Sequence, residues 1–289
     1  MDYLQMKTVT AKSTVPLIGD AFQKINRTAI YWLAGAGFLI NARGTLAMID
    51  PLLKTTPGHP ELCETGAVLK VNYPIDADDV PKLDAVLYTH SDDDHLAELT
   101  AKSLSHLNPK LIGPPPVFEK LARMRIDVDL LISCRSKEEL HFQNMRIEVF
   151  PADHPWQLQD PLRLGKPFRE GDAVGFIIET PDVLCFFPGD TRLMEEHLYM
   201  KGIQFLALDV SLCTYHINPQ GARNLANILK DAYLMPYHYG TFDLPDVPAF
   251  CGDPATVLDE VTNGYQRAII TAPGQSVIFE KGQLVDPVH

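Results

Sequence analysis

The sequence of 289 residues has no apolar run approaching the roughly 20 residues that a membrane-crossing helix needs. Residues 1–7 lack both a basic segment and an apolar core, so no secretory signal is expected. Internal repeats, low-complexity tracts and linkers are absent as well. These absences argue against an integral membrane protein and favour a single cytoplasmic domain that spans residues 1–289.

Positive charge is also scarce. The chain has 25 Lys and Arg against 37 Asp and Glu, which gives a net charge of −12. An acidic chain lacks a broad electrostatic grip on phosphate backbones, so no nucleic-acid partner is expected. The 5 cysteines have no paired spacing, and an odd number favours free thiols in a reducing compartment. Composition leaves an oligomer of identical chains open.

The most informative segment is Thr-His-Ser-Asp-Asp-Asp-His at residues 89–95, directly after an apolar run. It concentrates His90, Asp92, Asp94 and His95 where a strand ends and a helix-like segment begins. Ligand-binding loops gather at the carboxyl ends of strands, and histidine with carboxylate is a common metal-binding set. The alternative is an acidic helix N-terminus in which aspartates cap the next helix, but capping leaves both histidines unexplained.

Three further polar residues follow other predicted strands. His154 comes after the alternating run 145–150, Asp190 follows Phe-Pro-Gly, and His238 follows Met-Pro-Tyr. Each one alone is better explained as an ordinary strand-end histidine or a turn aspartate than as a metal ligand. Together with residues 89–95 they place polar clusters at four strand ends, which favours a shared metal site.

In this order the residues resemble the signature of the metallo-β-lactamase superfamily, His-x-His-x-Asp-His followed by a His, an Asp and a final His. Segments 32–40 and 48–51 resemble the family's opening strands. Segments 216–219 and 238–242 resemble the branch that contains ascorbate-6-phosphate lactonase. The similarity spans about residues 28–280. Because helix and strand patterns alternate, an α/β class is expected, and the resemblance implies a four-layer αββα sandwich with two mixed β-sheets face to face and outer helices.

The resemblance also implies two neighbouring metal subsites that share one carboxylate. The implied ligands are His90, Asp92 and His154 for the first ion, Asp94, His95 and His238 for the second, and Asp190 between them. Asp94 is in addition expected to orient the attacking nucleophile.

Asp92 departs from the family pattern, which has a histidine at this place. Three carboxylates and a bridging hydroxide neutralise two divalent ions, whereas a histidine at position 92 leaves a positive charge. A less positive centre polarises a substrate less and acidifies bound water less. Oxygen ligands suit manganese or iron, but the four histidines form a good set for zinc. One or two divalent ions are therefore expected, with zinc first and manganese or iron as alternatives.

The implied activity is that of a metal-dependent hydrolase whose metal-bound hydroxide attacks an electrophilic carbon or phosphorus. The expected substrate is an ester or lactone of a small anionic metabolite. Phosphodiesterase activity is the alternative, and a non-catalytic member that keeps the ligands for stability or sensing is a third hypothesis. His216 is the candidate for proton donation or transition-state stabilisation, with an ordinary surface-loop histidine as the alternative.

Residues that follow His154 and Asp190 are candidates for substrate binding. Basic groups in the irregular segment 155–172 would rim the metal cleft and bind a phosphate or carboxylate; a solvated loop is the alternative. For Arg192 the alternative is a salt bridge with Glu195 or Glu196. The candidates are Trp156, Arg163, Lys166, Arg169, Arg192 and Tyr215.

Periodicity and turn residues predict the remaining elements. Residues 28–50 predict three short strands, and the Pro- and Gly-rich residues 51–82 predict a long loop that could act as a lid. Helices are predicted over 96–107, 114–123, 219–231 (capped by Asn218) and 253–263, a hairpin over 137–150, and a last strand over 275–279.

Overall fold

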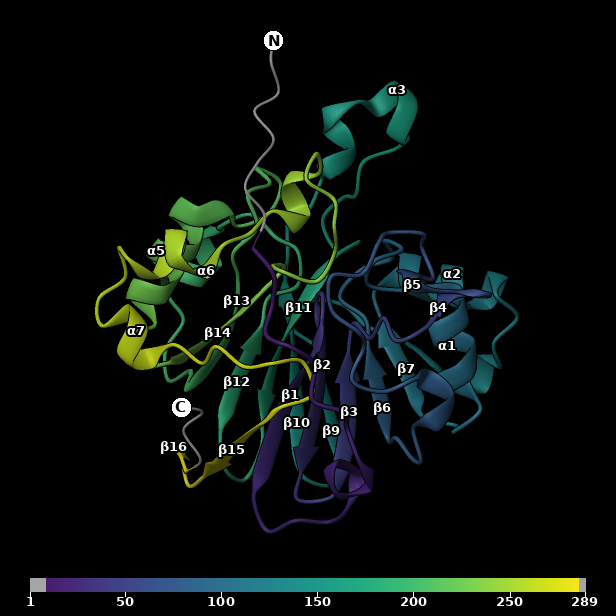
Figure 1. Ribbon diagram of the computed structural model, residues 1–289, viewed down its shortest axis with the longest axis horizontal. Helices are drawn as coiled ribbons and strands as arrows, with labels where there is room; N and C mark the ends of the chain where they lie inside the picture. The colour runs from purple at the N-terminus through teal and green to yellow at the C-terminus, as the bar shows by residue number, and fades with distance from the viewer. Residues whose placement is uncertain (1–8, 286–289) are drawn as a thin grey trace.

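The structure is a computed structural model that describes residues 9–285. Two β-sheets lie face to face in the middle of the molecule, and helices cover the outer side of each (Figure 1). The predicted α/β fold, a four-layer αββα sandwich, is therefore confirmed. The expectation of a missing secretory signal concerns residues that lie outside the described range. Within residues 9–285, every helix is too short or too polar to cross a bilayer.

One sheet has eight strands and is mixed. Its antiparallel part runs to β3, and β3, β6, β7 and β8 are parallel to one another. In spatial order the strands are β16 (Gln283–Leu284), β15 (Ser276–Glu280), β1 (Thr28–Ala34), β2 (Gly37–Ala42), β3 (Thr45–Ile49), β6 (Ala85–Leu87), β7 (Lys110–Gly113) and β8 (Leu131–Ser133).

The second sheet has six strands and is also mixed. Strands β12, β13 and β14 are parallel, and the other neighbours are antiparallel. In spatial order the strands are β14 (Tyr233–Tyr237), β13 (Phe205–Asp209), β12 (Leu184–Phe187), β11 (Val174–Glu179), β10 (Met145–Pro151) and β9 (Glu139–Phe142).

The helices divide between the two outer faces, with α1 and α2 beside one sheet and α5 to α7 beside the other (Figure 1). Their bounds are α1 (Glu98–Ser105), α2 (Pro115–Arg123), α3 (Pro161–Leu164), α4 (Glu195–Leu198), α5 (Asn218–Ile228), α6 (Pro254–Leu258) and α7 (Gly264–Arg267). The predicted cap of α5 is confirmed, because the Asn218 carboxamide accepts hydrogen bonds from the main-chain N–H groups of Gln220 and Gly221.

Side chains of β1 alternate between two hydrophobic clusters. Ile30 and Trp32 pack with residues of both sheets, whereas Tyr31 and Leu33 pack under α1 and α2. Every residue of β1, β2 and β3 is buried because both faces of this sheet are covered. The double layer gives rigid support to the loops that follow β3, β6, β10, β12, β13 and β14.

Residues 51–82 contain two short strands, β4 (Thr55–Thr56) and β5 (His59–Cys63), where the sequence predicted only a loop. Glu64 in this segment accepts hydrogen bonds from the N–H groups of Leu99 and Thr100, at 2.6 and 3.0 Å. This carboxylate therefore satisfies two of the free main-chain donors at the α1 N-terminus. The aspartates of the 89–95 loop do not cap α1, so the capping alternative for that loop is wrong.

The helix predicted over 253–263 is wrong in its length. Helix α6 ends at Leu258, and α7 begins only at Gly264. Asn263 has a φ of +53°, in the left-handed region, so the chain leaves the helical path there.

Candidate metal centre

Asp190 lies at the centre of the site. It follows β12 in a Pro-Gly-Asp turn, and Gly189 makes this turn with a φ of +63°. A Cβ atom on Gly189 would lie 2.6 Å from the Cβ of Thr89. Glycine is required because it both adopts the left-handed backbone and lets the turn pack against the 89–95 loop. The turn thereby holds the buried Asp190 carboxylate against that loop.

Five histidines direct a ring nitrogen at this carboxylate. Nε2 of His95 and Nε2 of His216 are each 3.2 Å from its Oδ2 atom. Nε2 of His154 and of His90 are 3.8 and 3.9 Å from the same oxygen, and Nδ1 of His238 is 3.5 Å from Oδ1. The structure thus brings together the four histidines of the predicted ligand set and adds the predicted catalytic histidine to the same cluster.

The ligand atoms form overlapping groups that share the central carboxylate. Two of these groups, each with its atoms within 4.8 Å of one another, are His90, His154 and Asp190, and Asp94, His95, Asp190 and His238. Oδ2 of Asp92 is 3.3 Å from Nε2 of His90 and 3.5 Å from Nε2 of His154. These two groups contain the histidines of the two predicted subsites, and Asp92 lies beside the first group.

The buried polar atoms of this cluster fit a bound cation. Nε2 of His90, Nε2 of His95, Oδ1 of Asp190 and both ring nitrogens of His238 are buried and make no hydrogen bond to the described residues. An unsatisfied buried polar atom costs about 1–3 kcal/mol, so several within one cluster are unfavourable unless a ligand binds them. Imidazole and carboxylate are the ligands that zinc and related divalent metals prefer.

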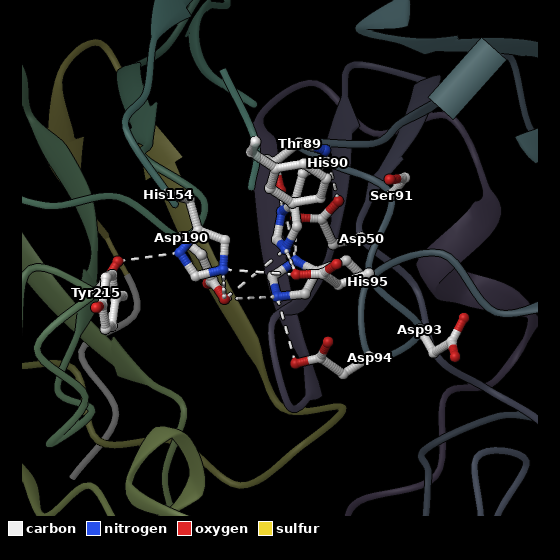
Figure 2. Close-up of polar contacts among 12 residues, drawn as sticks. Asp50, Thr89, His90, Ser91, Asp93, Asp94, His95, His154, Asp190 and Tyr215 are labelled. Carbon is white, nitrogen blue, oxygen red and sulfur yellow. Dashed lines mark hydrogen bonds and ion pairs between the residues drawn. The ribbon is translucent and has the colours of Figure 1, made fainter. Parts of the chain in front are cut away.

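Asp50 fixes the orientation of one ligand. It follows β3, and its Oδ2 atom is 2.9 Å from Nδ1 of His95. Thr89 donates to the same carboxylate through its main-chain N–H and its hydroxyl, at 2.8 and 2.6 Å (Figure 2). A carboxylate on one ring nitrogen selects the tautomer and leaves Nε2 of His95 free to bind a metal.

Two other histidines are fixed in the same way. Nδ1 of His216 is 2.8 Å from Oδ2 of Asp209, which lies at the end of β13. Nδ1 of His154 donates to the main-chain carbonyl of Tyr215 at 3.0 Å (Figure 2). These contacts turn the Nε2 atoms of both rings towards Asp190.

Backbone strain is concentrated at the same place. His238 and Asp50 have φ values of +60° and +43°, in a region that residues other than glycine rarely adopt. Such strain persists where the surrounding structure enforces it and is common at functional sites. Here it directs two side chains that follow strands of different sheets into one cluster.

Burial and neighbouring opposite charges shift the pKa values of the cluster residues in opposite directions. Burial raises the pKa of Asp190, but the charges of His216, His95 and His238 hold that pKa well below its usual value. Burial lowers the pKa of His95, but Asp190 and Asp50 together raise it well above its usual value. The cluster therefore keeps its central carboxylate ionised, which is the state that binds a cation.

Residues 48–239 match the family model described as Beta-lactamase superfamily domain. The chain belongs to the metallo-β-lactamase superfamily. A UPF0173 metal-dependent hydrolase of Sulfurisphaera tokodaii is 26% identical over 253 residues, covering 85% of this chain and 97% of that relative. Another, from Archaeoglobus fulgidus, is 25% identical over 261 residues, covering 87% and 99%. The protein is a metal-dependent hydrolase of this superfamily.

Solved structures share the fold at low sequence identity. Isothiocyanate hydrolase from Delia radicum gut bacteria has a TM-score of 0.66 and 16% identity, covering 87% of this chain and 99% of that chain. Igni18, a metallo hydrolase from Ignicoccus hospitalis, has a TM-score of 0.61 and 17% identity, covering 88% and 99%. At these identities the likeness concerns the metallo-β-lactamase fold alone.

The cluster of candidate metal ligands borders a cavity of about 560 Å³. Asp92, Asp94, His154, Asp190 and His216 are among the residues that line it. Apolar groups come from two segments, the one that carries α3 and the loop after β14. They are Trp156, Leu164, Val247, Pro248, Ala249 and Phe250. The α3 segment projects from the body of the sandwich (Figure 1).

Among the substrate-binding candidates, Trp156 and Arg163 line this cavity, whereas Lys166 does not. Arg192 does not line it either, because Nε of its guanidinium binds Oδ2 of Asp153 at 2.8 Å. The predicted anion-binding role of Arg192 is therefore corrected to a salt bridge.

The partner of this arginine is not Glu195 or Glu196, as the alternative for Arg192 had proposed. Tyr215 contributes its carbonyl rather than its ring, since that carbonyl fixes His154. Arg169 likewise does not line the cavity.

Asp50 and Asp209 were not predicted as members of this metallo-β-lactamase site. Both directly follow or end a buried strand, which is the signal that identified Asp190. Applied to every strand, that rule would have found them. The sequence gives no comparable signal for Thr89, whose two hydrogen bonds to Asp50 depend on how β3 and β6 pair.

Proposed function

We propose that this metal-dependent hydrolase cleaves a carboxylic ester or lactone whose acyl part carries a single anionic group. The cavity beside the metal cluster is the observation that supports this proposal. Its walls include apolar side chains from two segments, and Arg163 is its one lysine or arginine among residues 9–285. Apolar walls favour an aliphatic or aromatic body, and one guanidinium pairs with one carboxylate or phosphate.

The acidic side of the cavity disfavours a polyanionic substrate. Apart from the metal ligands, whose charge bound ions would offset, Asp93 and Asp246 line it together with Arg163. An ester with several negative charges would therefore meet two carboxylates and only one guanidinium. A neutral ester bond next to one anionic group matches this distribution better.

The cluster residues supply the binding of the metal. His90, Asp92 and His154 would hold one divalent ion, Asp94, His95 and His238 a second, and Asp190 both. When bound, such ions polarise the scissile carbonyl and lower the pKa of a water molecule.

Two residues near the cavity have roles of their own. Asp94 lines the cavity with a partly exposed carboxylate 3.6 Å from Nε2 of His95, so it would accept a hydrogen bond from the attacking water and orient it. Arg163 would hold the anionic end of the substrate, and the Trp156 ring would pack against its apolar part.

A substrate panel tests the proposal. Protein loaded separately with zinc, manganese or iron is assayed on δ-lactones, on sugar-phosphate lactones, on p-nitrophenyl esters with and without a terminal carboxylate, and on bis(p-nitrophenyl) phosphate. We expect metal-dependent turnover of esters or lactones. Turnover of the phosphodiester alone would support the alternative chemistry, and no turnover with any metal would support a non-catalytic role; either result contradicts the proposal.

Arg163→Ala tests the anionic group. A charge-assisted hydrogen bond contributes about 1.5–3 kcal/mol, so the variant should raise KM for the carboxylate-bearing ester by about tenfold or more. KM for the matched neutral ester should stay the same. Lys166→Ala is the control, because Lys166 lies on the same segment but does not line the cavity.

A further inference from the structure

His95 and His216 occupy equivalent positions around the central carboxylate. Nε2 of each ring is 3.2 Å from Oδ2 of Asp190. His95 follows a strand of the eight-stranded sheet, and His216 follows a strand of the six-stranded sheet. The two rings therefore approach one oxygen atom from opposite sheets.

The second nitrogen of each ring has an equivalent partner. Nδ1 of His95 is 2.9 Å from a carboxylate oxygen of Asp50, and Nδ1 of His216 is 2.8 Å from one of Asp209. The other oxygen of each carboxylate accepts a main-chain N–H at 2.8 Å, in one case from Thr89 and in the other from Ser211. Both aspartates are buried.

This arrangement is the one that prepares a histidine for metal binding. A carboxylate that accepts the Nδ1 proton leaves a lone pair on Nε2 and fixes the direction of the ring. We propose that His216 is a metal ligand and that Asp209 is the residue that positions it. His216 would join Asp190 and His238 in holding the second ion. Potential ligand atoms of Asp190, Asp209, His216 and His238 all lie within 4.8 Å of one another, which is consistent with this role.

The role differs from the proton donor that the sequence suggested for His216. A donor requires a proton on Nε2, whereas a ligand requires a lone pair there. The inference rests on the metal dependence of the superfamily and not on the proposed ester substrate, so failure of the substrate panel leaves it intact.

Zinc binding to the metal-free protein provides the test. Protein stripped with a chelator is titrated with Zn²⁺ against a chromophoric competitor, and bound zinc is counted by mass spectrometry. His216→Ala and His216→Gln should both weaken zinc binding at least tenfold or lose one ion. Glutamine keeps a hydrogen-bond donor for Asp190 but is a poor zinc ligand. Unchanged zinc binding in His216→Gln would show a hydrogen-bonded clamp and overturn the proposal.

Asp209→Asn tests the positioning role. Loss of such a partner weakens metal binding by about 10–100-fold, and Asp50→Asn, the equivalent change beside His95, should cause a loss of the same order. His141→Ala is the control, because His141 is exposed on β9 and lies outside the cluster. Full zinc affinity in Asp209→Asn would contradict the positioning role.

A direct spectroscopic measurement covers the case in which the alanine variant fails to fold. In wild-type protein labelled with ¹⁵N-histidine and loaded with ¹¹³Cd²⁺, Nε2 of His216 should show one-bond coupling to cadmium. The signal is assigned by its disappearance in His216→Gln. Coupling at the other cluster histidines without coupling at His216 would overturn the proposal.

Discussion

Gly189→Ala is expected to damage both stability and metal binding, because Gly189 sets the distance between the two sides of the site. The new Cβ atom would lie 2.6 Å from Cβ of Thr89 on the 89–95 loop. A left-handed backbone costs about 1–2 kcal/mol for alanine, and overpacking adds about 1–3 kcal/mol. The free energy of unfolding should therefore fall by about 2–5 kcal/mol. Urea denaturation in excess chelator measures this loss without a contribution from bound metal.

Gly58→Ala is the matched control. Gly58 also has a positive φ, of +80°, but a Cβ atom there would meet nothing within 4 Å. In this variant the free energy of unfolding should fall only by the cost of the left-handed backbone, about 1–2 kcal/mol. Zinc affinity should fall in Gly189→Ala, since the turn that carries Asp190 must move away from Thr89, and should be unchanged in Gly58→Ala. Equal destabilisation of the two variants, with equal zinc affinity, would refute the role assigned to this turn.

Two further predictions concern a buried histidine and the five cysteines. Burial lowers the pKa of His197 to about 4, so below its ordinary value of 6.5 the unfolded chain binds a proton that the folded chain does not. The free energy of unfolding should fall by up to about 3 kcal/mol between pH 6.5 and 4. In urea denaturation, His197→Asn, which keeps an acceptor for the Met194 N–H, should lack that fall. All five cysteines are free and buried, so Ellman's reagent should react slowly with native protein and with all five thiols after denaturation; fast reaction of native protein would contradict their burial.

Much of the site could be predicted from the sequence because its residues follow strands. A strand ends where a turn residue or proline stops the ladder, and parallel strands bring their carboxyl ends to one edge. His154, Asp190 and His238 each stand at such a place, and their distances in the fold agree with that expectation.

Side-chain direction in the irregular segments could not be predicted. Arg163 and Lys166 both follow His154 in the sequence, but only Arg163 lines the cavity, and their positions in the sequence do not distinguish them. Arg192 binds Asp153, a residue 39 positions away, rather than a neighbouring glutamate. Such pairs depend on how two loops pack, and local periodicity carries no information about that packing.

The hydrogen-bond partners of the ligands were missed for a related reason. An aspartate that follows an apolar strand can either stabilise a turn or accept a hydrogen bond from a histidine ligand. Only the tertiary contact distinguishes these two roles. Asp50 reaches His95 across 45 positions of sequence. Asp209 and His216 are only seven residues apart, yet their contact depends on the loop after β13.

Metal analysis of wild-type protein and of Asp190→Ala, both purified without chelators, tests the central claim most directly. Asp190 is the carboxylate that five histidine rings share. We expect two divalent ions per wild-type chain and the loss of metal together with hydrolytic activity in the variant. An Asp190→Ala protein that keeps its full complement of metal, or a wild-type protein that binds none of zinc, manganese or iron, would contradict it.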